Sequence, residues 1–387
     1  MDYNSVIDEL KFIIENINLE YLNISIIEEN VQYLYNIYLQ IKKEYSVISS
    51  MDFPIENIKS GPIYDKVVEN ISYISLPEKE KDILKEKVKS INKLEYGNTF
   101  LFWISFDDEK DNSQYAFKMF KIFLCLQNFY KPSKDEYKNR IVIWFPIDSK
   151  RDFYFDKINE DTLLYTKKKF GAFVASGLTT INNNFFYPIR NLSRITIITR
   201  YEEIEKLLIH ELIHNFNMDG NEYLTDLNSI ITEYNSIKPN NNYTYDFSIF
   251  ESYVELSSTY FYLIFKNINE DVENVKDKLF SQIVIEIIYS YNIIANLIKL
   301  NEYDNYEKFK ETIKFKGEIP FYEYYYVKAL MYNNYIFKLG YKLKNFINIY
   351  ENIIYLIKKN IKNDDKLMKE IYSHSHKNFI NFKYQIH

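Results

Sequence analysis

The sequence predicts an α+β fold that is mostly helical and contains one small mixed sheet. Apolar residues recur at helical spacing in 1–95 and again in 221–387, whereas 96–220 holds short apolar runs rich in β-branched and aromatic residues. A His-Glu-x-x-His motif lies in the last apolar stretch of that middle range. We therefore expect three parts: a helical N-terminal subdomain, a sheet-containing part that ends in the motif helix, and a helical C-terminal part.

The N-terminal part, 1–95, is expected to be helical because it carries two sets of apolar residues at helical spacing. The sets are Leu10, Ile13, Ile14 and Ile17, followed by Val31, Leu34, Tyr35 and Tyr38. Pro54 and the pair Gly61-Pro62 interrupt the pattern, as such residues do between helices. No group of catalytic residues stands out here, so packing or partner contacts are the expected role.

The middle part is expected to form the sheet. Four extended segments are predicted from their apolar, β-favouring composition: 99–106, 140–146, 171–180 and 193–199. A helical stretch near 114–129 separates the first two of them. Gly177, in the third segment, permits the close approach of another backbone.

The motif helix is expected over 201–219, directly after the last strand. Its apolar stripe consists of Ile204, Leu208, Leu212 and Phe216. Gly220 is well placed to end the helix, as glycine often does. Five further helices are predicted downstream, near 222–236, 247–265, 269–300, 319–338 and 341–360.

The motif itself places His210 and His214 four residues apart, with Glu211 directly after the first. Positions four apart on a helix lie one turn apart on one face, so both imidazoles can reach a single Zn²⁺ ion. Glu211 is rotated by about 100° from His210, beside the metal, where its carboxylate can take the proton of a water molecule. The motif therefore predicts one catalytic zinc ion, with Glu211 as the general base.

A catalytic zinc site needs a third protein ligand and leaves its fourth position to water. Gly220, six residues after His214, cannot bind a metal, and Asp219 lies about 140° round the helix from that histidine. Glu203 lies two turns before His210 on nearly the same face. We keep Glu203 as a candidate for an alternative ligand or for a group that supports one.

A later helix offers a better third ligand. Glu251 and Glu255 stand four residues apart on one face, and the small residues Ser257 and Ser258 would let this helix approach the motif helix closely. We expect Glu251 to bind the metal and Glu255 to accept a hydrogen bond from a ligand imidazole. The reverse assignment of the two glutamates stays open.

These residues resemble those of zincin metallopeptidases of the gluzincin kind, which carry a His-Glu-x-x-His helix and a ligand glutamate on a following helix. The matching positions are His210, Glu211, His214, Glu251 and Glu255. The wider pattern, Ser176-Gly177-x-Thr179 and then Thr199-Arg200-x-Glu202-Glu203, is similar to His-Glu-x-x-His proteins of large DNA viruses. The resemblance covers roughly 170–265, and the Asn-Glu-x-x-Ser/Thr-Asp form of the glutamate motif is absent.

The resemblance implies a zincin-like catalytic core and the zinc-dependent hydrolysis of peptide bonds. It also implies that Ser176, Gly177 and Thr179 belong to an edge strand against which a peptide substrate lies. A donor that stabilises the transition state is expected as well. His374 and His376 are candidates because histidines are rare in this chain, which has five.

Composition sets limits on the remaining possibilities. The net charge is -6, and Lys and Arg are scattered among acids, so no nucleic-acid partner is expected. Polar residues interrupt the longest apolar stretch, 279–300, and no signal peptide is visible, so we expect no membrane partner. The single cysteine, Cys125, favours a reducing compartment. We expect a cytoplasmic protein, in a host cell or a virion, that acts on a peptide or protein.

Two alternatives to a peptidase stay open. The first is a catalytically silent protein of the zincin fold, which would use the same zinc ion for binding or for virion structure. The intact Glu211 argues against it, because zinc binding alone does not need that residue. The second is a helical structural protein with a chance motif, in which Glu251 would not approach His210 and His214.

Overall fold

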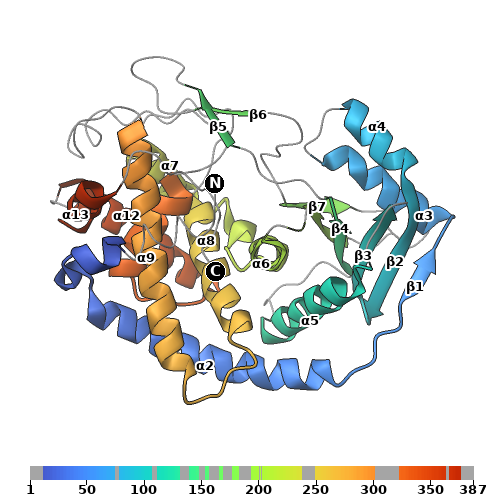
Figure 1. The fold of residues 1–387 in the computed structure, drawn as a ribbon, viewed down its shortest axis with the longest axis horizontal. Coiled ribbons are helices and arrows are strands. Elements are labelled where there is room, and N and C mark those ends of the chain that lie inside the picture. Colours follow the sequence, from blue (N-terminus) through green and yellow to red (C-terminus); the bar gives the residue numbers. More distant parts are fainter. Residues whose placement is uncertain are drawn as a thin grey trace. The chain divides into compact units, whose positions relative to one another are not determined.

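The computed structural model describes residues 12–74, 78–106, 111–130, 139–147, 153–156, 165–168, 177–182, 193–199, 201, 203–237, 249–300, 322–362 and 366–375. The chain divides into two compact units, whose elements are labelled in Figure 1. Unit 1 comprises 1–37, 153–167 and 219–387, and unit 2 comprises 38–152 and 168–218. The range 1–95, expected to be one subdomain, is therefore shared between the two units.

Unit 2 contains a six-stranded mixed sheet, so the predicted combination of many helices with a small mixed sheet is confirmed. The strand order is β1 (Glu56–Ile58), β2 (Val88–Tyr96), β3 (Thr99–Phe106), β4 (Asn139–Phe145), β8 (Ser193–Thr199) and β7 (Gly177–Asn182). β3, β4 and β8 run parallel to one another, and the other neighbours are antiparallel. β7 is thus an edge strand of this sheet.

β1 and all of β2 except Tyr96 lie within the range expected to be helical, so that prediction is wrong for 56–58 and 88–95. β2 pairs with β3 across a two-residue loop, and Tyr96 lies opposite Thr99. Gly97 in this loop has a φ of 56°, a left-handed conformation that glycine adopts without steric cost and that two-residue hairpins need. Pairing with β3 therefore draws 88–96 into the sheet.

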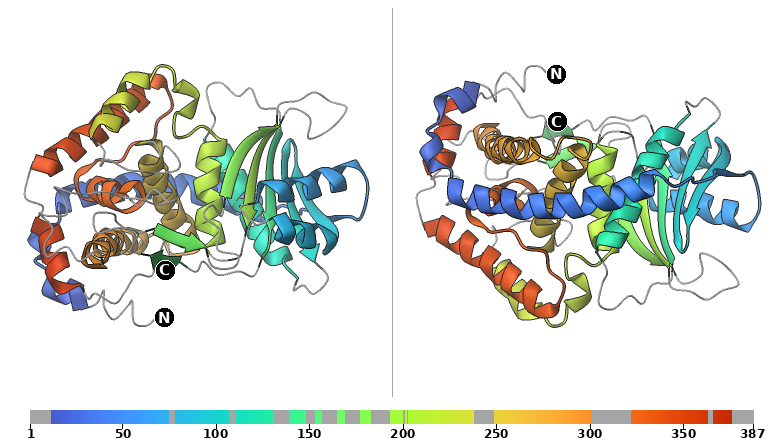
Figure 2. Two further views of the ribbon diagram at one scale, coloured as in Figure 1. Left: turned by 90° about the horizontal axis from the view of Figure 1, so that it is seen from above. Right: turned by 90° about the horizontal axis from the view of Figure 1, so that it is seen from below.

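Helices cover both faces of the sheet (Figure 2). On one face, α3 (Pro62–Glu69), the 3-10 turn η2 (Asn70–Tyr73) and α4 (Glu78–Glu86) pack against alternate residues of the central strands, such as Phe102 and Ile143. On the other face lie α5 (Ser113–Phe129) and α6 (Ile204–Asn215). The ring of Tyr115, in α5, contacts Trp144 of β4 on that face, with centroids 6.4 Å apart. Burial on both faces explains why β4 is a nearly continuous apolar run.

The described part of unit 1 is mainly helical and also holds a strand pair, β5 (Phe153–Asp156) and β6 (Tyr165–Lys168). Helix α2 (Ile24–Ser49) begins in this unit. The later helices are α7 (Asn228–Ile237), α8 (Ile249–Lys266), α9 (Val275–Leu300), α11 (Lys328–Asn334), α12 (Leu343–Lys362) and α13 (Lys366–His374). Three short segments complete the unit: η1 (Leu19–Tyr21), η3 (Asn221–Tyr223) and the π-helical η4 (Tyr322–Val327). The five predicted downstream helices are confirmed, with shifted ends.

Gly220 occupies a position in unit 1 that only glycine fits. Its φ is 73°, and a Cβ atom there would lie 2.5 Å from Cγ of Phe346. Any larger residue would meet both the strain of a left-handed conformation and that ring.

Helix α8 is buried along almost its whole length, including Ser257 and Ser258. Its Tyr260 packs edge-on against Phe337, with ring centroids 4.9 Å apart. Across the described ranges, no helix combines the length and the apolar character that crossing a lipid bilayer demands.

Candidate metal centre

The motif helix α6 begins later than predicted, at Ile204 rather than near 201. Glu203 precedes it with a φ of 56°, a left-handed conformation outside the right-handed helical range. Tyr201 is held outside the helix, where its ring packs against Trp144 at 5.5 Å and its hydroxyl donates to Asn112. Glu203 is therefore the cap residue of the helix, and its carbonyl oxygen accepts from the amide of Leu207 at 3.0 Å. Its role near the metal stays a prediction.

The helix also ends earlier than predicted, at Asn215. Asn217 adopts the left-handed conformation, with a φ of 55°, and the amide of Met218 donates back to the carbonyl of Ile213 at 2.9 Å. This is the usual way in which a helix closes at its C-terminus, and asparagine can replace glycine there. The prediction that Gly220 ends the helix is wrong, because Asn217 adopts the left-handed conformation three residues earlier.

Two buried arginines hold this end of the helix. Arg140, at the start of β4, donates to the carbonyl oxygen of Asn215 and, at 2.7 Å, to its Oδ1 atom. Arg194, on the neighbouring β8, donates to Oδ1 of Asn217. The carbonyl groups that end a helix lack intrahelical partners and carry partial negative charge, so guanidinium donors stabilise them. The sheet therefore fixes the position of the motif helix.

His210 and His214 lie one turn apart on one face of α6, as the spacing predicts. Their ring centroids are 5.2 Å apart, and His210 is buried while His214 is half-buried. The neighbouring Ile209 and Ile213 are fully buried and anchor the helix in unit 2. The two imidazoles are thus held on a fixed backbone.

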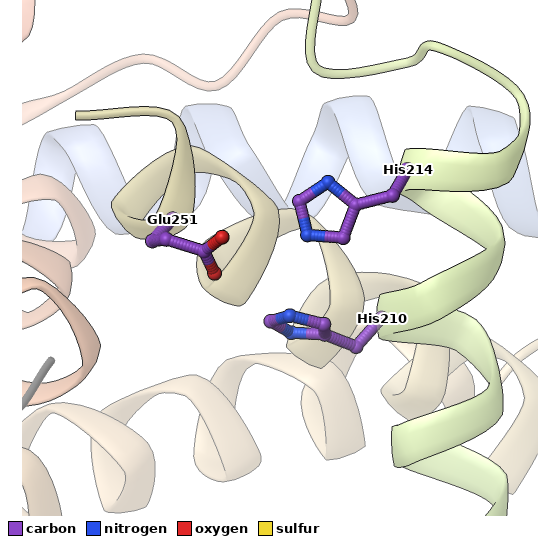
Figure 3. A group of neighbouring side chains, drawn as sticks. All are labelled: His210, His214 and Glu251. Carbon is purple, nitrogen blue, oxygen red and sulfur yellow. The ribbon is translucent and has the colours of Figure 1, made fainter. Parts of the chain in front are cut away.

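The third residue of the site is Glu251, in the first turn of α8. One ligand atom from each of His210, His214 and Glu251 lies within 4.8 Å of the other two. Figure 3 shows the two imidazoles and the carboxylate pointing toward one another. Among the described residues, this is the one group of three or more metal-binding side chains that come together in this way.

The donor set fits zinc. Two imidazole nitrogens and one carboxylate oxygen form a ligand set of catalytic zinc sites, which leaves a fourth position for water. Ligands at about 2.1 Å from one ion in tetrahedral geometry lie about 3.4 Å apart, and the three ligand atoms here lie within 4.8 Å of one another.

Glu211 is held on the sheet side of the helix by Thr179 of β7. The hydroxyl of Thr179 lies 3.0 Å from Oε2 of Glu211 and 3.0 Å from the carbonyl oxygen of the same residue. It also lies 3.2 Å from the hydroxyl of Thr196, its partner across the β7–β8 ladder. Thr179 thus lies on the sheet's edge strand, and its side chain contacts the predicted general base.

Glu255 is engaged within unit 1. Nζ of Lys328 donates to its Oε1 at 3.3 Å and lies 4.0 Å from Oε2 of Glu286, and all three side chains are buried. One turn earlier on α8, the hydroxyl of Tyr324 donates to Oε2 of Glu251 at 3.3 Å. The two glutamates of α8 therefore meet two residues, Tyr324 and Lys328, that are also four positions apart.

Several of these partners were not identified from the sequence. Tyr324 is one of 38 tyrosines, and nothing in its surroundings marks it. The sequence does not distinguish Lys328 from other lysines on helices. Only the structure shows that it is buried, at 0% exposure, and contacts Glu255. Thr196 could have been found from the strand register, since it lies opposite Thr179.

The remaining candidates lie elsewhere or outside the described residues. His374, at the end of α13, packs edge-on against Phe12, with centroids 6.3 Å apart. Asp219 is fully buried, with Oδ1 accepting from the amide of Asn221 at 3.1 Å. Ser176 and His376 fall outside the described residues.

Comparison with models of known protein families, with curated proteins and with solved structures finds no match.

Proposed function

We propose that this chain is a zinc-dependent metallopeptidase of the zincin kind. The observation that carries the proposal is the grouping of His210, His214 and Glu251, whose ligand atoms lie within 4.8 Å of one another. Glu211 adds to it, because a site that only binds zinc has no need of a carboxylate directly beside a ligand histidine.

The residues of the chain have distinct roles in this proposal. His210, His214 and Glu251 hold the ion, which when bound supplies a Lewis acid that polarises the scissile carbonyl and makes water more acidic. The carboxylate of Glu211 accepts a proton from the attacking water and later delivers it to the leaving amine. Burial of Glu211, at 7% exposure, limits competition from bulk water for that proton.

The substrate we propose is a peptide or an unfolded segment of a protein. β7 is an edge strand, so its outer backbone groups can pair with an extended peptide. Gly177 and Thr179 lie on this strand, next to the helix that carries Glu211. Leu178 is exposed and would lie beside such a peptide.

The experiment measures zinc content and hydrolysis on the same protein samples. The purified chain should bind one zinc ion and cleave fluorescein-labelled casein in a reaction that a chelator stops and zinc restores. Glu211→Gln should retain the zinc and lose hydrolysis, by at least about a hundredfold, since general-base catalysis contributes about 10²–10⁴-fold. His214→Ala should lose both.

Two results would decide against the peptidase. Glu211→Gln protein that cleaves casein at the wild-type rate would contradict the role of Glu211. Wild-type protein that binds zinc but cleaves neither casein nor a mixed peptide library would instead favour the silent, zinc-binding alternative.

A further inference from the structure

We infer that Thr179 is a positioning residue for Glu211, at the end of a hydrogen-bond chain that starts at the buried Arg140. This inference rests on the proposed function, because it concerns the proton transfer assigned to Glu211. The five hydrogen-bonded residues, Arg140, Asn215, Thr196, Thr179 and Glu211, all belong to unit 2.

The hydrogen-bond chain starts at the guanidinium group of Arg140, which can only donate hydrogen bonds. Arg140 is a permanent cation with N–H donors and no acceptor, and its Nη1 atom lies 2.7 Å from Oδ1 of Asn215. Because that oxygen accepts from Arg140, the amide nitrogen of Asn215 has to point the other way. It does so, and Nδ2 lies 3.0 Å from the hydroxyl oxygen of Thr196.

The direction continues through the two threonines. The carboxylate and the carbonyl of Glu211 can only accept here, so the single proton of Thr179 is directed to the Oε2 atom and the carbonyl oxygen, each 3.0 Å away. The hydroxyl of Thr196, which accepts from Asn215, then donates its own proton to the oxygen of Thr179, 3.2 Å away. Hydrogen bonds that follow one another in this way polarise and strengthen each other.

The consequence concerns the orientation of Glu211. Its Oε2 atom accepts from Thr179, so the carboxylate is held in the direction of that hydroxyl. A carboxylate held in this way loses the torsional freedom that would separate it from its reactive position. Thr179 itself touches no reacting atom and acts through Glu211.

The contact is tested first in metal-free protein, so that the result does not depend on hydrolysis. Trp103 and Trp144 are the two tryptophans of the chain and both lie in the sheet of unit 2, so their fluorescence reports its unfolding in urea. A double-mutant cycle of Thr179→Val with Glu211→Leu should show a coupling of about tenfold in the unfolding constant, the size of a hydrogen bond to a charged group.

A matched cycle provides the control. Thr180 neighbours Thr179 on the same strand, and adjacent strand residues point to opposite faces. Thr180→Val combined with Glu211→Leu should therefore show no coupling. Equal coupling in both cycles, or none in either, would overturn the inference.

The second test follows casein hydrolysis by the zinc-loaded protein. Thr179→Val should lower kcat by about tenfold or more and change KM by less than about twofold, because it removes orientation of the base and leaves substrate contacts in place. Thr179→Ser keeps the hydroxyl and should recover most of kcat. Thr196→Val should have a smaller effect, since Thr179 keeps its own proton.

These measurements separate the two proposals. Coupling in the metal-free protein with an unchanged kcat for Thr179→Val overturns the positioning role and leaves the peptidase proposal intact. Wild-type protein without zinc-dependent hydrolysis overturns the peptidase proposal, and the role of Thr179 in proton transfer with it. Zinc affinity should be the same in Thr179→Val and the wild type, because Thr179 contacts the base and not a ligand.

Discussion

Nζ of Lys328 lies 3.3 Å from Oε1 of Glu255, and each side chain is 1% exposed. A buried ion pair is costly to break from one side, because the remaining charge is left without compensation. Lys328 also faces Glu286 at 4.0 Å and lies over the ring of Tyr325, at 5.4 Å from its centroid. This contact joins α11 to the helix that carries Glu251.

Replacing Lys328 with Met should destabilise unit 1 by about 3–5 kcal/mol, since two buried carboxylates lose their cation. The free energy of unfolding, measured by urea denaturation and circular dichroism, checks this. Lys358 offers the matched control, because its ion pair with Glu233 is about half-exposed on both sides. Lys358→Met should change stability by at most about 1 kcal/mol. Similar losses in both variants would show that Lys328 has no special role.

Tyr324→Phe should weaken zinc binding about tenfold while the protein stays folded. The hydroxyl of Tyr324 donates to Oε2 of Glu251, and groups that orient a metal ligand contribute about 10–100-fold in affinity. Competition with a fluorescent zinc chelator measures the change. Tyr355→Phe, at an exposed tyrosine of α12, is the control and should bind zinc as the wild type does. Unchanged affinity in Tyr324→Phe would argue against Glu251 as a ligand oriented by this contact.

Removal of the metal should lower the thermal unfolding temperature. A ligand that binds only the folded state stabilises it by about 2.7 kcal/mol when its concentration is a hundred times its dissociation constant. Differential scanning fluorimetry with and without a chelator checks this, followed by addition of zinc to restore the transition. In the His214→Ala variant the chelator should not change the unfolding temperature. A decrease in that variant too would show that the zinc binds at another site.

Cys125 should resist alkylation in the folded protein. Burial in α5 raises the pKa of its thiol to about 12, with a smaller contribution from Glu44 in the same direction. At pH 8 only about one thiol in ten thousand is then the reactive thiolate. Mass spectrometry after iodoacetamide treatment should find no adduct in buffer and a complete one in urea. Rapid labelling in buffer would contradict the burial.

The same pKa shift predicts a dependence of stability on pH. The folded-state pKa lies above the ordinary value of 9.0, so the neutral thiol favours the folded state. This contribution is complete below pH 9 and is lost as the pH rises toward 12. Cys125→Ala should reduce this loss and leave the part contributed by tyrosines such as Tyr341, whose pKa is raised to about 12 by partial burial.

The features that depend on local spacing were predictable. His210 and His214 share a face because helical periodicity requires it, and Glu251 was identified because a zinc site needs one more ligand on a nearby buried helix. The strands β3, β4 and β8 were found from their apolar runs.

The features that depend on contacts outside an element's own apolar pattern were not predictable. Residues 88–96 form a strand because β3 pairs with them, and α6 ends at Asn215 because Asn217 takes a left-handed conformation. The partner of Glu255 lies 73 residues away in sequence, and no periodicity links it to that glutamate. A hairpin pairing, a cap at Asn217 held by Arg194 and an ion pair between distant residues decide these three cases.

The π-helical segment η4 constrains how the chain can vary in length. Tyr324 lies 73 residues after its partner Glu251, and Lys328 lies 73 residues after its partner Glu255. The two contacts, one turn apart on α8, therefore require the same register between the two segments. Deleting one residue between Tyr324 and Lys328 would turn one contact away from the helix face that both now share. Natural variants should therefore keep a constant length from Tyr324 to Lys328.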